Sequence, residues 1–177
     1  MNGTPKFSKV LSEGDIKIMV RDLADRIRKD YDGAPILLIG VLKGAFVFMT
    51  DLMRELRMDV EIDFVRLSSY GKNRHSSGTV TLLKDISRDI RGKHVLIVEE
   101  IIDSGRSLKF LYERLIQSEP ASLEIVTLLD KAQKRVVHVP VKYVGRKVDD
   151  QFLIGYGLDL EERERNLREV LTLSYPN

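Results

Sequence analysis

Residues 94–107 read His-Val-Leu-Ile-Val-Glu-Glu-Ile-Ile-Asp-Ser-Gly-Arg-Ser. The apolar run Val95–Val98 predicts a short strand that is buried on both faces. After Ser107, leucine and isoleucine recur at helical spacing, which predicts an amphipathic helix. The stretch is therefore a strand, a Gly-containing turn and a helix, which is the repeating unit of an α/β fold.

The rest of the chain alternates between strand and helix patterns. A helical face runs through Ile16–Ile27, and a long polar loop is predicted at Ser68–Thr79. The other predicted elements are a strand at Ile36–Val41, a helix at Gly44–Leu56, and strands at Val60–Phe64, Val80–Leu82, Leu123–Leu129, Phe152–Tyr156 and Val170–Leu173. We expect a mainly parallel central sheet flanked by helices, with ligands beyond the carboxyl ends of its strands.

The turn after residues 94–102 has the composition of a sugar phosphate site. The first N–H groups of a helix lack partners and attract an anion, and Gly105 allows a ligand to approach closely. The hydroxyls of Ser104 and Ser107 add donors. Glu99 and Glu100 are acceptors suited to vicinal ribose hydroxyls or to hydrated Mg²⁺. Together these residues predict a site for ribose 5-phosphate.

Each part has a purely structural alternative. Ser107 could be only a helix N-cap. The turn at residues 40–45 leads into a helix and could bind pyrophosphate, but it could equally be an ordinary connection, and it lacks the Gly-x-Gly-x-x-Gly pattern of dinucleotide sites. Lys131 could be surface charge, and Phe152 on its own would more often belong to a core.

The ordered set of segments resembles the hypoxanthine-guanine phosphoribosyltransferases, especially the bacterial ones, from about Ile36 to Leu167. The string of two acids, Asp-Ser-Gly and a later Ser resembles the phosphoribosyl pyrophosphate signature of type I phosphoribosyltransferases. The resemblance implies the type I fold with a small base-binding hood. It also implies a purine salvage enzyme that moves ribose 5-phosphate from phosphoribosyl pyrophosphate to N9 of hypoxanthine or guanine, giving IMP or GMP and pyrophosphate.

The resemblance also implies a role for each matching residue. Asp103 is the catalytic acid/base beside purine N7. The resemblance assigns binding of the phosphoribosyl group to Glu99, Glu100, Asp103, Ser104, Gly105, Arg106 and Ser107. It assigns binding of pyrophosphate to Leu42, Lys43, Gly44 and Arg165, with a cis peptide before the lysine. It assigns binding of the purine to Lys131, Phe152 and Leu153. Ser69 and Tyr70 match a lid over the site, and Glu99, Glu100 and Asp159 match ligands of the cofactor Mg²⁺.

The chain departs from the family pattern at a few positions. Glu100 stands where the family has Asp, so its side chain is one methylene longer. Ser104 and Ser107 stand where Thr is more usual and keep the hydroxyls. Ala45 and Gln151 replace a Gly and a Lys of other members. None of these changes removes a chemical group that the reaction requires.

Length and composition fit a single cytoplasmic enzyme domain, and the resemblance implies a phosphoribosyltransferase domain over residues 1–177. The chain is 43% hydrophobic and has a net charge of +2, so no charge excess favours nucleic acid or membrane as a partner. It has no cysteine, which gives secretion no support. The N-terminus has no signal-like apolar segment, and the apolar run at residues 35–42 is far shorter than the ~20 residues of a membrane helix.

A regulator that senses phosphoribosyl pyrophosphate and binds RNA or DNA is the rival interpretation. A regulator of this kind would be expected to carry an additional nucleic-acid-binding domain or a surface with basic residues on one side. Residues 161–165 instead mix acidic and basic side chains. The three histidines have no metal-ligand spacing. A transferase for a different base stays open. From the resemblance we expect small-molecule substrates and a homodimer or homotetramer.

Overall fold

The computed structural model of the chain describes residues 6–69 and 80–174. In chain order its elements are β1 (Lys6–Leu11), α1 (Glu13–Tyr31), β2 (Ile36–Leu42), α2 (Phe46–Leu56), β3 (Val60–Ser69), β4 (Val80–Lys84), β5 (His94–Ile102), α3 (Arg106–Ile116), β6 (Ser122–Asp130), the short 3-10 helix η1 (Ala132–Lys134), β7 (Tyr143–Lys147), β8 (Leu153–Ile154) and β9 (Val170–Ser174).

A six-stranded sheet forms the centre, in the order β4-β3-β2-β5-β6-β7. All neighbouring pairs are parallel except β3 and β4. At the start of β2, Ile36 lies level with Val60 of β3 and His94 of β5. The predicted α/β fold with a mainly parallel central sheet is confirmed.

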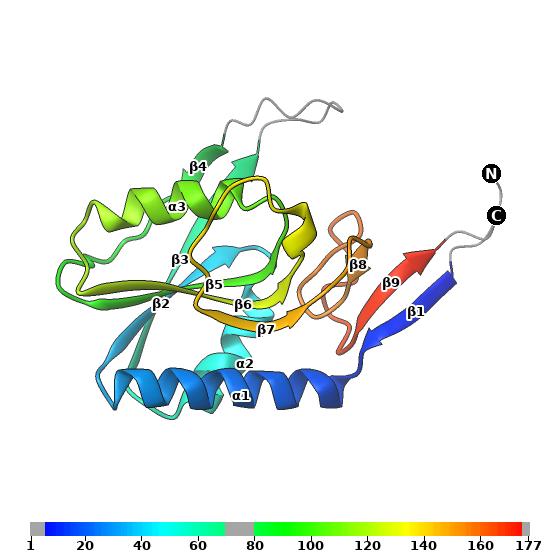
Figure 1. The fold of residues 1–177 in the computed structure, drawn as a ribbon, viewed down its shortest axis with the longest axis horizontal. Helices are drawn as coiled ribbons and strands as arrows, with labels where there is room; N and C mark the ends of the chain where they lie inside the picture. The colour runs from blue at the N-terminus through cyan, green and yellow to red at the C-terminus, as the bar shows by residue number, and fades with distance from the viewer. Residues whose placement is uncertain (1–5, 70–79, 175–177) are drawn as a thin grey trace.

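Alternate residues of the central strands face opposite layers of helices. Leu38 of β2 and Leu96 of β5 pack with α1 and α2, whereas Leu37 and Ile97 pack with α3. Figure 1 shows α3 above the sheet and α1 below it. Because both of their faces are covered, β2 and the first half of β5 are apolar without alternation, as the sequence predicts.

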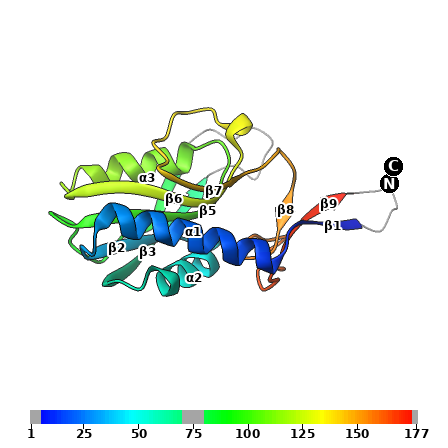
Figure 2. The ribbon, with the colours of Figure 1, turned by 60° about the horizontal axis from the view of Figure 1, so that its bottom comes forward.

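A second, smaller sheet joins distant parts of the chain, with the antiparallel order β1-β9-β8. It projects from one end of the molecule, where Figures 1 and 2 show β8, β9 and β1 beside one another. Gly157, shortly after β8, lies against the Gly44 carbonyl at the carboxyl end of β2. The small sheet and its loops therefore form a hood beside the carboxyl ends of the central strands.

Some boundaries differ from those that the sequence predicts. β1 and β7 were not predicted, and β8 is shorter than the predicted strand at Phe152–Tyr156. The predicted loop at Ser68–Thr79 was wrong at its start, because Ser68 and Ser69 continue β3 and pair with β4. Its remainder, including Tyr70 of the predicted lid, lies outside the described residues. Among the helices of the described segments, none has the length and hydropathy needed to cross a membrane.

Candidate active site

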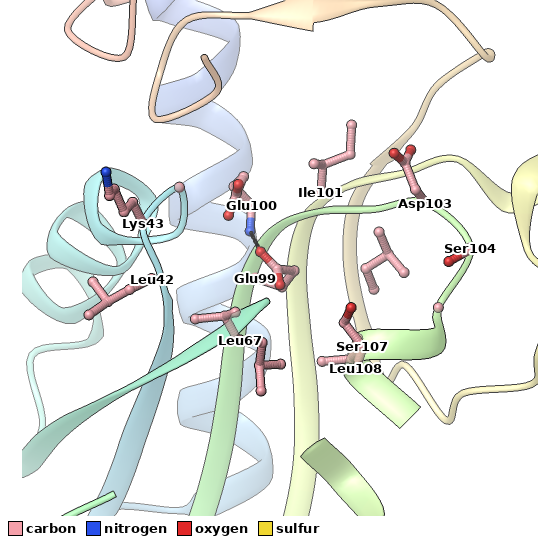
Figure 3. Close-up of a pocket in the computed structure, with 14 residues that line it drawn as sticks. Leu42, Lys43, Leu67, Glu99, Glu100, Ile101, Asp103, Ser104, Ser107 and Leu108 are labelled. Atoms are coloured by element: carbon pink, nitrogen blue, oxygen red, sulfur yellow. Dashed lines mark hydrogen bonds between the residues drawn. The ribbon is translucent and has the colours of Figure 1, made fainter. Parts of the chain in front are cut away.

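Three adjacent parallel strands bring most of the predicted phosphoribosyl- and pyrophosphate-binding residues together at their carboxyl ends. β2, β5 and β6 are neighbours and end at Leu42, Ile102 and Asp130. A pocket of about 260 Å³ lies at this edge. Its lining consists of Val41, Leu42, Lys43, Gly44, Leu67, Glu99, Glu100, Ile101, Ile102, Asp103, Ser104, Gly105, Ser107 and Leu108 (Figure 3).

The two glutamates lie within β5 and point in different directions (Figure 3). Successive strand residues face opposite sides of a sheet, so Glu99 and Glu100 are not equivalent. The Glu100 backbone N–H donates to Glu99 Oε1 at 3.0 Å. Burial raises the pKa of Glu99 well above its usual range, and the Glu100 carboxylate raises it further. Burial also raises the pKa of Glu100. This crowded, poorly hydrated acid pair favours a ligand that supplies positive charge or hydroxyl donors.

Glu100 carries an acceptor that has no protein partner. Its Oε2 atom is buried and makes no hydrogen bond. An unsatisfied buried carboxylate oxygen is costly, and a cation or a ribose hydroxyl would satisfy it. Among residues 6–69 and 80–174, no group of three potential ligands forms a ready-made metal cage, and Asp159 is instead paired with Arg165 at 3.0 Å. Mg²⁺ often uses only one or two carboxylates together with substrate phosphates and water, so the acid pair fits this ion.

The turn after β2 lies against the Glu100 carboxylate. The peptide bond between Leu42 and Lys43 is cis, which is the form that the resemblance implies. A Cβ atom added to Gly44 would overlap the Glu100 carboxylate. The Gly44 carbonyl in turn leaves no space for a Cβ atom at Gly157. The hood and the turn therefore meet closely beside the acid pair.

We expect Gly44→Ala to reduce kcat/KM for the phosphoribosyl donor by about tenfold, because the added methyl displaces the Glu100 carboxylate and loses roughly one hydrogen bond or ion contact. The flexible side chain can move, so thermal stability should change little. The double variant Gly44→Ala/Glu100→Asp should recover part of the loss, since the shorter carboxylate withdraws from the methyl. Steady-state kinetics of the two variants and of Glu100→Asp alone give the comparison. A double variant that is no better than Gly44→Ala would contradict this steric explanation.

The loop after β5 leaves helix N–H groups open to the pocket. Helix α3 begins at Arg106, and Gly105 is its N-cap with a φ of 81°, a left-handed conformation that suits glycine. Gly105 has no side chain to cap the helix, and the Ser104 hydroxyl accepts from the Arg106 N–H at 3.5 Å. The alternative interpretation of Ser107 as the N-cap is therefore wrong, and its hydroxyl is not used as that cap. Ser104, Gly105 and Ser107 line the pocket, whereas the exposed Arg106 side chain does not. This geometry can hold a phosphate.

The two cations proposed for pyrophosphate share one counter-ion. Lys43 Nζ lies 2.8 Å from Glu162 Oε2, and Arg165 Nη2 lies 3.1 Å from the same oxygen. Arg165 also donates to the Gly157 carbonyl at 2.8 Å. The pKa of Glu162 is lowered by its hydrogen bonds from Lys43 and Arg165, so its carboxylate stays charged. Both cations are thus paired with Glu162, and the Lys43 side chain points away from Asp103 (Figure 3).

The proposed base-binding residues include a buried lysine next to Asp103. The Lys131 ammonium is buried, with 6% of the residue exposed, and lies 3.3 Å from Asp103 Oδ1. Phe152 is 52% exposed although it is aromatic, whereas Leu153 is buried in β8. The exposed Phe152 ring offers a stacking surface for a planar base, and the buried Lys131 ammonium offers a hydrogen-bond donor.

Several residues at the site were not predicted from the sequence. Leu67, Ile101 and Leu108 contribute apolar lining, and Asp150 forms ion pairs with Lys131 and Lys134. The apolar residues carry no signal beyond their strand or helix pattern. Asp150 precedes Phe152 in an irregular segment, and only the folded chain brings it to Lys131. Of the predicted lid, Ser69 ends β3, and Tyr70 is outside the described residues.

Comparisons with known proteins agree on one family. The model of the phosphoribosyl transferase domain matches residues 8–161. Hypoxanthine phosphoribosyltransferase of Escherichia coli strain K12 is 45% identical over 160 residues, covering 89% of this chain and 90% of the relative. Hypoxanthine-guanine phosphoribosyltransferase of Staphylococcus aureus strain Mu50 is 43% identical over 164 residues, covering 93% of this chain and 92% of the relative.

The solved structures give the same result at the level of the fold. The crystal structure of a hypoxanthine-guanine phosphoribosyltransferase from Bacillus anthracis superposes with a TM-score of 0.89 at 40% identity. The match covers 97% of this chain and 100% of that one. With its sheet, its pocket and its sequence all in agreement, this chain belongs to the phosphoribosyl transferase family, within the group of hypoxanthine-guanine phosphoribosyltransferases.

Proposed function

We propose that this protein is a purine salvage enzyme that transfers ribose 5-phosphate from phosphoribosyl pyrophosphate to N9 of hypoxanthine or guanine. The observation that carries the proposal is the meeting, at one sheet edge, of the acid pair, the open helix N-terminus and the Asp103–Lys131 pair. The substrates are small molecules, and residues 1–177 act as a single phosphoribosyltransferase domain. The names of the relatives support this choice of base.

The donor would lie along the pocket. The N–H groups at the start of α3, together with the Ser104 and Ser107 hydroxyls, would hold the 5-phosphate. Glu99 and Glu100 would hold the ribose hydroxyls and Mg²⁺. The turn at residues 42–44, with Arg165, would receive the pyrophosphate as it leaves. Neutralising the leaving group lowers the barrier because negative charge develops there while the ribose gains oxocarbenium character.

Mg²⁺ would supply further neutralisation of the pyrophosphate. Asp103, which lines the pocket next to Lys131, would hold or accept the purine proton as N9 attacks. Lys131 can only donate, so its ammonium favours a base with a 6-oxygen. A 6-amino group would meet a donor instead of an acceptor, and adenine should therefore be rejected. Ser69 and Tyr70 belong to the proposed lid that would exclude water.

Family membership also supports proposals for the cellular location and the oligomeric state of the protein. We place the enzyme in the cytoplasm, and we expect a homodimer or homotetramer. One solved relative, from Trypanosoma cruzi, is a hypoxanthine phosphoribosyl transferase whose description concerns the role of the C-terminal region in its oligomeric state. Size-exclusion chromatography with light scattering would determine the assembly of this chain.

Turnover with the four purines hypoxanthine, guanine, xanthine and adenine tests the proposed function. With phosphoribosyl pyrophosphate and Mg²⁺, we expect hypoxanthine or guanine to be converted to its nucleotide and adenine to be left unchanged. Removal of Mg²⁺ with a chelator should abolish turnover, and added Mg²⁺ should restore it. Absence of turnover with both hypoxanthine and guanine, together with sequence-specific RNA or DNA binding, would favour the regulator instead.

Glu100→Asp tests the departure at the acid pair. The long side chain of Glu100 already places its carboxylate against Gly44, and a shorter acid can reach a ligand through a water molecule. We therefore expect the donor KM to change by only about two- to fivefold, on the scale of one weakened contact, with no change in base preference. A large gain in kcat would show that Glu100 impairs this reaction. Steady-state kinetics at varied donor concentration measure both outcomes.

A further inference from the structure

Lys131 is held between two carboxylates. Its ammonium lies 3.3 Å from Asp103 Oδ1 and 3.8 Å from Asp150 Oδ1. The same Asp150 oxygen lies 2.8 Å from Lys134 Nζ. The four side chains thus alternate in charge, from Asp103 to Lys131, Asp150 and Lys134. Lys131 is the only one of the four that is buried.

A buried ammonium needs a counter-charge at every stage of the reaction. An unpaired buried charge is strongly unfavourable, so Lys131 will keep the nearest carboxylate that is free to pair with it. In the structure that carboxylate is Asp103. When a base is bound, Asp103 must face the purine proton, and the 6-oxygen offers Lys131 a dipole but no full charge. Asp150 is then the remaining carboxylate within reach of Lys131 among the described residues.

Asp150 is suited to this task by its charge and its place in the chain. The hydrogen bond from Lys134 lowers the pKa of Asp150, which keeps its carboxylate ionised. Asp150 comes two residues before Phe152, in the segment that joins β7 to the hood. Its contact with Lys131 therefore connects the hood to the end of β6. The hood carries Phe152, the proposed stacking ring, and the end of β6 carries Lys131, the proposed donor to the 6-oxygen.

We propose that Asp150 is a positioning residue for 6-oxopurine recognition. It holds the Lys131 ammonium in place and releases Asp103 to act on the purine. The inference rests on the proposed function and assigns a further residue to it. Without the Asp150 charge, Lys131 would pair only with Asp103, and an incoming 6-oxopurine would have to break that pair. The resulting increase in KM should therefore be confined to bases that carry the 6-oxygen.

Asp150→Asn, compared with Asp149→Asn, is the test. Asp149 is also exposed and is the adjacent residue, and it makes no side-chain ion pair with any part of the described chain. We expect Asp150→Asn to raise the KM for hypoxanthine about 5- to 20-fold, the scale of one charge-assisted contact. The donor KM should stay within about twofold of the parent value, because the donor pocket does not include Asp150. Asp150→Glu, which keeps the carboxylate, should restore most of the hypoxanthine KM.

Two further measurements distinguish positioning from general damage. Unsubstituted purine, which lacks the 6-oxygen, should inhibit the parent and Asp150→Asn with the same constant. In a Lys131→Ala background, Asp150→Asn should have no additional effect, since the group through which it acts is absent. An equal loss for hypoxanthine and unsubstituted purine, an added loss in the Lys131→Ala background, or an Asp150→Asn variant equal to Asp149→Asn would each overturn the inference. A parent chain that turns over no 6-oxopurine would overturn the proposed function as well.

Discussion

Asp103→Asn is expected to lower kcat by about 10²–10⁴-fold, the usual contribution of a positioned acid or base. Asparagine keeps the shape of the side chain but cannot take up a proton at neutral pH. It also removes the negative charge that faces Lys131 at 3.3 Å. The KM for the phosphoribosyl donor should change much less than kcat, because the loop at residues 104–107 and the acid pair Glu99 and Glu100 remain intact. Single-turnover and steady-state kinetics with saturating hypoxanthine measure both quantities.

The matched control is again Asp149→Asn, which makes the same substitution at an exposed position near the site. It should have the parent kcat. Because the Asp103 side chain is 53% exposed, its replacement should also leave thermal unfolding nearly unchanged. An Asp103→Asn variant within a few-fold of the parent rate would remove Asp103 from the acid/base role, even if the donor and the base still bind.

The strand, turn and helix at residues 94–116 could be predicted because their local patterns and their tertiary environment agree. Val95 and Leu96 are buried on opposite faces, and Leu111 lies in the core on the α3 side. The same agreement applies to α1, where Ser12 and Asp15 in addition form a capping box. Such segments need no information from the rest of the chain, and their boundaries differ from the predicted ones by only a few residues.

The missed strands depend on partners that are distant in the sequence. β1 pairs with β9, and its residues Lys6–Lys9 are largely exposed, so it lacks the alternation of a half-buried strand. β7 is short, contains Gly145 and becomes a strand by pairing with β6 at the sheet edge. The Gly145 position also lies against the Leu128 carbonyl, a close approach that favours glycine. These elements form because of tertiary contacts that no local pattern records.

The same distinction applies to the candidate site. Glu99, Glu100 and the loop at residues 104–107 lie in one continuous segment, so the sequence alone places them close together. The pairings of Glu162 with Lys43 and of Asp150 with Lys131 join residues from separate segments. The contact between Glu100 and Gly44 likewise depends on β2 and β5 being neighbours. Sequence motifs can therefore name the groups proposed to touch substrate, whereas the residues that contact those groups from other segments become visible only in the folded chain.

Lys131→Ala is expected to lower kcat/KM for hypoxanthine and guanine by about 10- to 100-fold, the value of a hydrogen bond from a charged donor. Its ammonium is buried beside Asp103, where water competes poorly for the 6-oxygen. The donor KM should be nearly unchanged, because Lys131 does not line the donor pocket. Phe152→Ala should instead weaken every base, including unsubstituted purine, since it removes a stacking surface without regard to the 6-position.

Lys147→Ala is the matched control for Lys131→Ala. Lys147 is exposed at the end of β7, next to β6, and makes no ion pair within residues 6–69 and 80–174, so its loss should leave all kinetic constants unchanged. Thermal unfolding of Lys131→Ala must be measured as well, because truncating a buried side chain can destabilise the sheet edge. A folded Lys131→Ala variant with parent kinetics for both 6-oxopurines would show that the lysine only balances the charges of Asp103 and Asp150. Recognition of the 6-oxygen would then belong to another donor, and the role inferred for Asp150 would fail with it.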